Sequence, residues 1–172
     1  MKKLFLLDGH ALVYRAHYAF IGRPLINSKG LNTSAISGFT RTLWDIINNE
    51  KPSHIAVAFD LHGPTFRHEE FPAYKANREA QPEDISIALP YIEEIVKAFN
   101  IPIVTAESYE ADDVIGTLAK QAAGEGFDVF MVTPKIYSPW LGFIQSYPTN
   151  KNLIHIFSQQ RSRIFIFLRI VQ

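Results

Sequence analysis

The sequence contains no cysteine. Disulfide bonds, catalysis by a thiolate and zinc sites built from thiolates are therefore excluded. The six histidines show neither an HExxH motif nor a similar metal-binding spacing.

Long apolar runs are also missing. A membrane-spanning helix needs about 20 consecutive apolar residues, and no segment provides them. The chain starts with two lysines before LFLL, but this apolar run ends after four residues at Asp8. A buried first strand is expected here rather than a signal peptide. We therefore expect a cytoplasmic protein with no membrane partner.

Acidic residues are absent from residues 129–172, which contain five basic residues. All 17 acids lie in residues 1–128, which carry a net charge of −5, so the zero formal charge conceals two unlike parts. The last part has no clean helical period, and its run Ile164–Leu168 has high β-propensity. We expect one domain over residues 1–134 and an unmatched tail of uncertain structure over 135–172, which is not a domain.

Strand and helix patterns alternate before that break. Strands are expected at 3–7, 54–59, 101–104 and 127–132, and helices at 35–48, 85–99 and 112–123. Such alternation favours a parallel α/β sheet flanked by helices. Hydrophobic residues make up 47% of the 172 residues, which suffices for a core.

Five carboxylates follow or precede these expected elements. Asp8 and Asp60 end two strands, and the sequence YEADD places Glu110, Asp112 and Asp113 at the start of a helix. Because the carboxyl ends of parallel strands share one edge, these acids should converge on one crevice. Five acids without partner cations would repel one another, and a divalent metal is the simplest counter-charge. Metal-assisted phosphate chemistry is the leading hypothesis.

Each acid taken alone also has a structural explanation. Asp8 could simply cap the helix that follows it, and acids in a first helical turn favour the helix dipole. Glu110 and Asp113 share a helical face, whereas Asp112 points elsewhere. These explanations account for one or two acids but not for five.

A segment that combines basic and aromatic residues separates Asp60 from the helix expected at 85–99. It reads LHGPTFRHEEFPAYKANREAQPED and carries the bases Arg67, His68, Lys75 and Arg78 among Phe66, Phe71 and Tyr74. Cations beside aromatic rings suit a single-stranded nucleic acid. A solvated loop whose acids cancel its bases is the alternative, and composition does not decide between them.

Four stretches together carry a resemblance. LFLLDGHALVYRAHYAF, IAVAFD, FRHEEFPAYKANR and YEADDVIGTLA resemble the 5′→3′ exonuclease domain of bacterial DNA polymerase I, within the flap-endonuclease family, through residue 134. The resemblance implies a PIN-like parallel α/β core with a helical arch at about 63–84. It also implies hydrolysis of DNA phosphodiesters at or near 5′ ends and flaps, with no small-molecule cofactor.

The resemblance also implies roles for individual residues. The expected ligands of Mg²⁺ or Mn²⁺ are Asp8, Asp60, Glu110, Asp112 and Asp113. The arch residues Lys75 and Arg78 would contact the phosphate being cut and, with Asp60, form the catalytic set. The DNA contacts would be Arg15, Arg67, Tyr74, Lys75 and Arg78, with Tyr74 stacking on a base.

The sequence departs from the family after MVTP. The family normally continues with Asp-Lys-Asp, which supplies two more metal ligands, but this chain has Lys135-Ile136-Tyr137. A later pair of acids and the helix–three-turn–helix that grips duplex DNA are missing too. We therefore expect one weak metal site where the family has two. A frameshifted or truncated reading frame after Pro134 is favoured over a divergent but selected ending.

Two functions follow from this departure. The chain is either a 5′ nuclease with weak or no activity, as the nuclease part of DNA polymerase I, or a non-catalytic DNA-binding remnant. A response-regulator-like or phosphatase-like α/β domain is a weaker alternative, because such domains also place acids at strand ends. The sequence does not indicate an oligomeric state.

Overall fold

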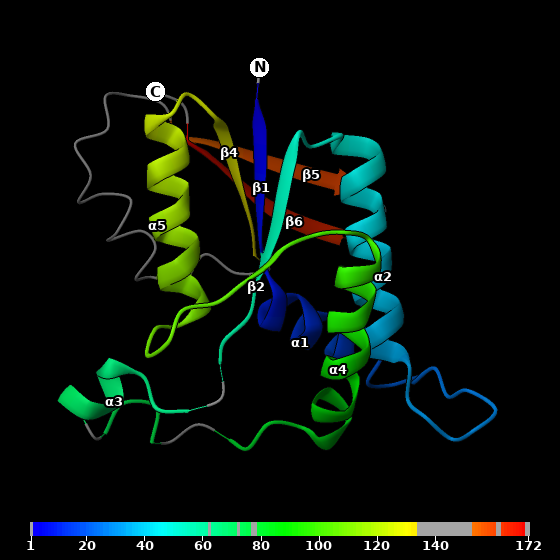
Figure 1. Ribbon diagram of the computed structural model, residues 1–172. Coiled ribbons are helices and arrows are strands. Elements are labelled where there is room, and N and C mark those ends of the chain that lie inside the picture. The colour runs from blue at the N-terminus through cyan, green and yellow to red at the C-terminus, as the bar shows by residue number, and fades with distance from the viewer. Residues whose placement is uncertain are drawn as a thin grey trace.

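A parallel sheet forms the centre of the molecule (Figure 1). The computed structural model describes residues 2–61, 63–71, 73–76 and 79–133, and the backbone of 153–160 and 163–170. The parallel strands are β1 (Lys3–Asp8), β2 (His54–Ala58), β3 (Ile103–Val104) and β4 (Asp128–Thr133). They lie in the order β3-β2-β1-β4 and are mutually parallel, which confirms the predicted fold class.

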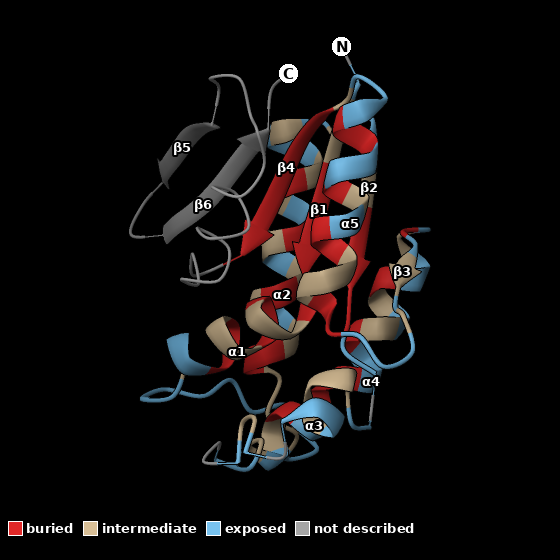
Figure 2. Cartoon of the chain, turned by 90° about the vertical axis from the view of Figure 1, so that its left-hand side faces the viewer, coloured by how far each residue is buried: buried red, intermediate tan, exposed pale blue. Residues whose placement is uncertain are grey.

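Helices cover both faces of this sheet, as Figure 2 shows. Their bounds are α1 (Gly9–Ala19), α2 (Ser34–Asp45) with a π-helical end (Ile46–Glu50), α3 (Phe66–Glu70), α4 (Glu83–Ala98) and α5 (Ala111–Gly124). Helices α1, α2 and α4 pack on one face around Phe5 and Leu7, whereas α5 packs on the other around Leu6 and Met131. This alternation along β1 follows the two-residue period of a strand, and it explains why the central strands read as continuous apolar runs.

The expected strands and helices are confirmed to within a few residues. Helix α1 begins directly after Asp8 and was not among the expected elements. Pro90 lies inside α4, and the helix continues through it to Ala98. Because α4 packs Ile85, Leu89 and other apolar residues against the core, tertiary contacts offset the hydrogen bond that the proline cannot donate.

The acid-free part contributes two further strands. Strands β5 (Leu153–Gln160) and β6 (Arg163–Ile170) pair with each other as antiparallel neighbours, and β6 pairs antiparallel with β4. The apolar run Ile164–Leu168 lies in β6, in keeping with its β-propensity. Residues 134–152 lie outside the described residues, and the domain boundary at 134 stays a prediction.

The turn from β1 into α1 is tightly packed against the end of β2. A Cβ atom at Gly9 would overlap the ring of Phe59, so the close approach of these two segments requires glycine. This contact brings Asp8 and Asp60, the neighbours of Gly9 and Phe59, to the same edge of the sheet. Among the described residues, no helix is both long enough and apolar enough to cross a membrane.

Candidate functional site

Backbone hydrogen bonds fix the strand-end carboxylates. Asp8 is the last residue of β1, and its Oδ1 atom accepts the N–H of Ala11 at 3.0 Å, so it does cap α1. Asp60 lies two residues beyond β2, and its Oδ1 atom accepts the N–H of Ala111 at 2.6 Å. This second bond joins the end of β2 to the first turn of α5, where Glu110, Asp112 and Asp113 lie. The convergence predicted from the strand ends is therefore observed.

Three of the acids influence one another electrostatically. Burial raises the pKa of Asp8 to about 7, and the charges of Asp112 and Asp60 add to the rise against the opposing hydrogen bond from Ala11. Burial also raises the pKa of Asp112 to about 6, with contributions from Asp60 and Glu110. Within the described part of the chain, no hydrogen bond or close ion pair reaches the Asp112 carboxylate. The charge of Lys75 opposes this rise in the pKa of Asp112.

The basic segment supplies partner cations for the other two acids. The Arg67 guanidinium donates from Nη1 and Nη2 to the two carboxylate oxygens of Asp113, each at 2.6 Å. Lys75 Nζ lies 2.7 Å from Glu110 Oε1, and the Tyr74 hydroxyl donates to Glu110 Oε2 at 3.3 Å. The premise that the acids have no partner cations is therefore wrong for Glu110 and Asp113. The reason is a tertiary contact between two segments about 40 residues apart.

Local contacts hold this segment near the N-terminal end of α5 (Figure 1). The Phe66 N–H donates to the Ser108 carbonyl at 3.0 Å, and the rings of Phe66 and Tyr109 lie 5.3 Å apart. Lys75 has a φ of 57°, a left-handed conformation that is uncommon for a residue with a side chain. Of the arch expected at about 63–84, the described residues supply α3, a turn at 73–76 and the start of α4.

The other predicted site residues are Arg15 and Arg78. Arg15 is half-buried on α1, and its contact with DNA stays a prediction. Arg78 lies outside the described residues. His10 was missed by the sequence analysis: its Nδ1 atom accepts the N–H of Asp60 at 3.2 Å and lies 3.8 Å from Asp60 Oδ2. Its position two residues after Asp8 was the available signal.

The donor chemistry of the cluster fits a hard divalent cation, because carboxylate oxygens are the ligands that Mg²⁺ and Mn²⁺ prefer. In the described ranges, however, no group of three or more acids or histidines is arranged to hold a metal as it stands. Glu110 is turned toward Lys75 and Tyr74. A metal would therefore need the side chains to move together.

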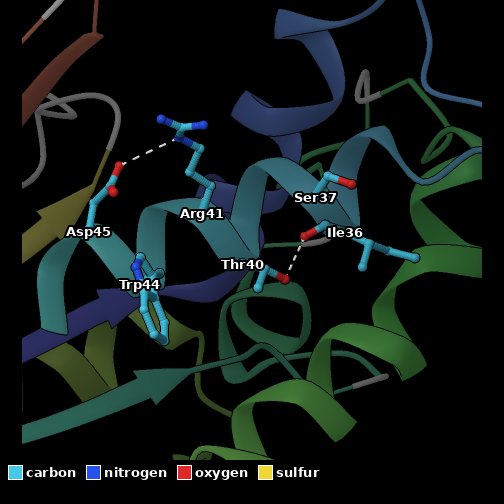
Figure 3. A pocket seen from close by; sticks show the side chains of 6 residues that line it. All are labelled: Ile36, Ser37, Thr40, Arg41, Trp44 and Asp45. Atoms are coloured by element: carbon cyan, nitrogen blue, oxygen red, sulfur yellow. Dashed lines mark hydrogen bonds and ion pairs between the residues drawn. The ribbon is translucent and has the colours of Figure 1, made fainter. Parts of the chain in front are cut away.

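A separate hollow of about 610 Å³ lies on the outer face of α2 (Figure 3). Its lining residues are Ile36, Ser37, Thr40, Arg41, Trp44 and Asp45. None of the five candidate carboxylates borders it. The candidate chemistry and this hollow are thus on different parts of the molecule.

The raised pKa of Asp8 predicts how stability changes with pH in the metal-free protein. From about pH 4 to about pH 7, folded Asp8 holds a proton that the unfolded chain has released, so stability falls as pH rises. We expect the free energy of unfolding to drop by about 2–4 kcal/mol across this window. Asp112 contributes in the same direction. The Arg67 guanidinium lowers the pKa of Asp113. This carboxylate therefore has the opposite effect: it makes stability rise with pH, at pH values below the usual pKa of an aspartate.

Urea unfolding with EDTA at pH 5 and pH 8 measures this effect. The variant Asp8→Asn should lose most of the difference, whereas Glu125→Gln, at an exposed acid, should keep it. An unchanged pH dependence in Asp8→Asn would show that burial of this carboxyl does not control stability.

Comparison with known proteins identifies the family. Residues 3–135 match the family described as "5'-3' exonuclease, N-terminal resolvase-like domain". The chain belongs to this family. The match to the 5′-3′ exonuclease family ends at residue 135, within the acid-free residues 129–172.

Curated relatives carry the same domain within longer chains. DNA polymerase I of Bacillus caldotenax is 46% identical over 133 residues, covering 77% of this chain and 15% of the relative. DNA polymerase I of Chloroflexus aurantiacus is 47% identical over 130 residues, covering 76% and 14%. The chain thus spans about one seventh of the length of these relatives.

Solved structures share the fold of the 5′-3′ exonuclease domain. A T5 protein co-crystallised with metal ions has a TM-score of 0.61 and 24% identity, covering 81% of this chain and 51% of that chain. T5 5′-exonuclease with bound divalent zinc ions has a TM-score of 0.56 and 21% identity, covering 83% and 52%. At this identity the likeness establishes the fold alone.

Proposed function

We propose that this chain is a metal-dependent 5′ nuclease domain that hydrolyses DNA phosphodiesters at or near 5′ ends and flaps. The observation that carries the proposal is the cluster of Asp8, Asp60 and Asp112 beside a basic, aromatic segment. Family membership supports it. So does a bacteriophage T5 flap endonuclease of similar fold, which has been crystallised with DNA and metal ions. The cytoplasmic location stays a prediction.

In this proposal, four carboxylates hold the metal: Asp8, Asp60, Glu110 and Asp112. The ion is Mg²⁺ or Mn²⁺, and about one is expected because residues 129–172 contain no acid to complete a second site. When bound, such an ion polarises a phosphate and lowers the pKa of a bound water. Asp113 is left out of this set because both of its oxygens already accept hydrogen bonds from Arg67.

The basic segment would provide the contacts to DNA. Lys75 lies against the carboxylate cluster, so its ammonium group could meet a phosphate bound there and neutralise the charge that develops during cleavage. Arg78 would act with it. Tyr74 would offer its ring to a base after leaving Glu110, and Arg15 would contact a more distant phosphate.

A second candidate is a non-catalytic domain that binds DNA. The sequence Lys135-Ile136-Tyr137, which replaces an acidic segment, favours it, because the lost acids would reduce the metal charge at the site. This candidate predicts binding of 5′-tailed DNA with no cleavage under any metal condition.

A cleavage assay on 5′-flap DNA separates these candidates. With Mg²⁺ or Mn²⁺ we expect slow release of 5′-phosphorylated products, which stops with EDTA and in the variant Asp60→Ala. The variant Glu125→Ala, at an exposed acid on the far end of α5, should cleave like the parent chain. Binding without cleavage would support the second candidate, and the absence of both would refute the proposed function.

A further inference from the structure

The Asp113 carboxylate is fully engaged by groups of the protein itself. Its two oxygens accept the forked hydrogen bonds of Arg67, and Oδ2 also accepts the N–H of Glu110 at 3.1 Å. The Asp113 side chain is only 25% exposed and that of Arg67 only 32%. The paired hydrogen bonds from a planar guanidinium to both carboxylate oxygens are strong and geometrically specific. Because three hydrogen bonds already occupy the Asp113 carboxylate, few lone pairs remain for a metal.

Arg67 is itself held from several directions. Its guanidinium lies 4.6 Å from the centre of the Phe66 ring, which contacts the ring of Tyr109. The Phe66 N–H is bound to the carbonyl of Ser108. These contacts connect α3 to the residues just before α5, and the Arg67–Asp113 pair adds a connection to the first turn of α5.

The Lys75–Glu110 pair is different in kind. Lys75 makes a single contact to Glu110 Oε1 at 2.7 Å, and the Tyr74 hydroxyl makes a longer bond of 3.3 Å to Oε2. The Glu110 side chain also forms a capping box with the backbone of Asp113 at the start of α5. A lysine ammonium on a flexible stem has no fixed orientation, unlike the arginine fork. The left-handed backbone at Lys75 adds local strain, which favours exchange of this contact.

We propose that Asp113 is a positioning residue that anchors the basic segment through Arg67, and that it does not ligate the metal. Lys75–Glu110 is then the exchangeable contact: Glu110 turns to the metal and Lys75 is freed toward the phosphate. The metal part of this inference rests on the proposed function. It also removes Arg67 from the direct DNA contacts, because its guanidinium is occupied.

Two measurements on the full chain test the anchor. The first is titration with Mn²⁺ alone, in which the Kd of Asp113→Asn should lie within about threefold of the Kd of the parent chain. Asp8→Asn, at a proposed ligand, should bind at least about tenfold more weakly. The second is the rate of trypsin cleavage after Lys75 in metal-free protein. Asp113→Asn and Arg67→Gln should each speed it about tenfold, as expected for loss of a partly buried charged pair.

Exchanging the charges of residues 67 and 113 tests whether the effect comes from the ion pair or from either substitution alone. The double variant Arg67→Asp, Asp113→Arg should restore slow cleavage after Lys75, whereas either change alone should not. Because the asparagine oxygen of Asp113→Asn can still accept the Glu110 N–H, α5 should retain its cap. Arg67→Gln leaves that cap untouched, so the test does not depend on one variant.

The outcomes are distinct. If Asp113→Asn weakens Mn²⁺ binding as much as Asp8→Asn, Asp113 is a ligand and the inference fails. If neither single variant changes the cleavage rate after Lys75, the pair is not an anchor and the inference also fails. If the parent chain binds no Mn²⁺, the proposed function is refuted, while the trypsin measurement still decides whether the pair is an anchor.

Discussion

Replacing Lys75 and Arg78 together with alanine should slow cleavage of 5′-flap DNA about 100- to 1000-fold. The ammonium of Lys75 lies at the carboxylate cluster, where a bound phosphate would develop charge. Affinity for 5′-tailed DNA should fall much less. Each lost phosphate contact reduces the salt slope by ~0.7 on single strands, so the slope should flatten by about one to one and a half.

The matched control removes two lysines from elsewhere on the surface. The variant Lys51→Ala, Lys97→Ala changes the net charge equally but alters exposed residues away from the cluster. It should leave the cleavage rate near that of the parent chain. If the Lys75 and Arg78 variant bound 5′-tailed DNA with unchanged affinity and salt dependence, the segment from Gly63 to Asp84 would not be the DNA contact.

Replacing Phe59 with alanine should lower the free energy of unfolding by about 3–5 kcal/mol, a large part of a typical total. Phe59 is 4% exposed and packs against Gly9, the ring of His10 and the ring of Phe39. Its removal leaves a cavity directly beside Asp60. The same variant should therefore weaken Mn²⁺ binding in protein that is still folded.

Urea unfolding of Phe59→Ala beside Phe71→Ala checks the magnitude. Phe71 is 61% exposed, so its truncation should change stability by no more than about 0.5 kcal/mol. Equal losses in the two variants would contradict the packing described at the end of β2.

The sheet and the edge that carries the site were predictable because they depend on simple patterns of apolar and acidic residues along the sequence. Continuous apolar runs marked β1 and β2, and acids at their ends had to meet at the carboxyl edge of a parallel sheet. The cation pairs were not predictable, because the segment that supplies Arg67 and Lys75 has few aliphatic residues and no period. Its position depends on contacts between side chains that are distant in sequence.

One helix and two strands were missed for different physical reasons. Helix α1 carries several polar residues in the sequence GHALVYRAHYA, which weakens its apolar pattern, although it buries Leu12, Val13 and Ala16. Strands β5 and β6 are rich in apolar residues without alternation, and such runs do not distinguish strand from helix.

Titration of the metal-free chain with Mn²⁺ tests the central claim most directly, since the account assigns the strand-end carboxylates to one divalent metal site. It predicts about one ion per chain, with binding abolished by Asp60→Ala or by Glu110→Ala and retained in Glu125→Ala. Tight binding of two ions, or binding that is unchanged in both Asp60→Ala and Glu110→Ala, would contradict it.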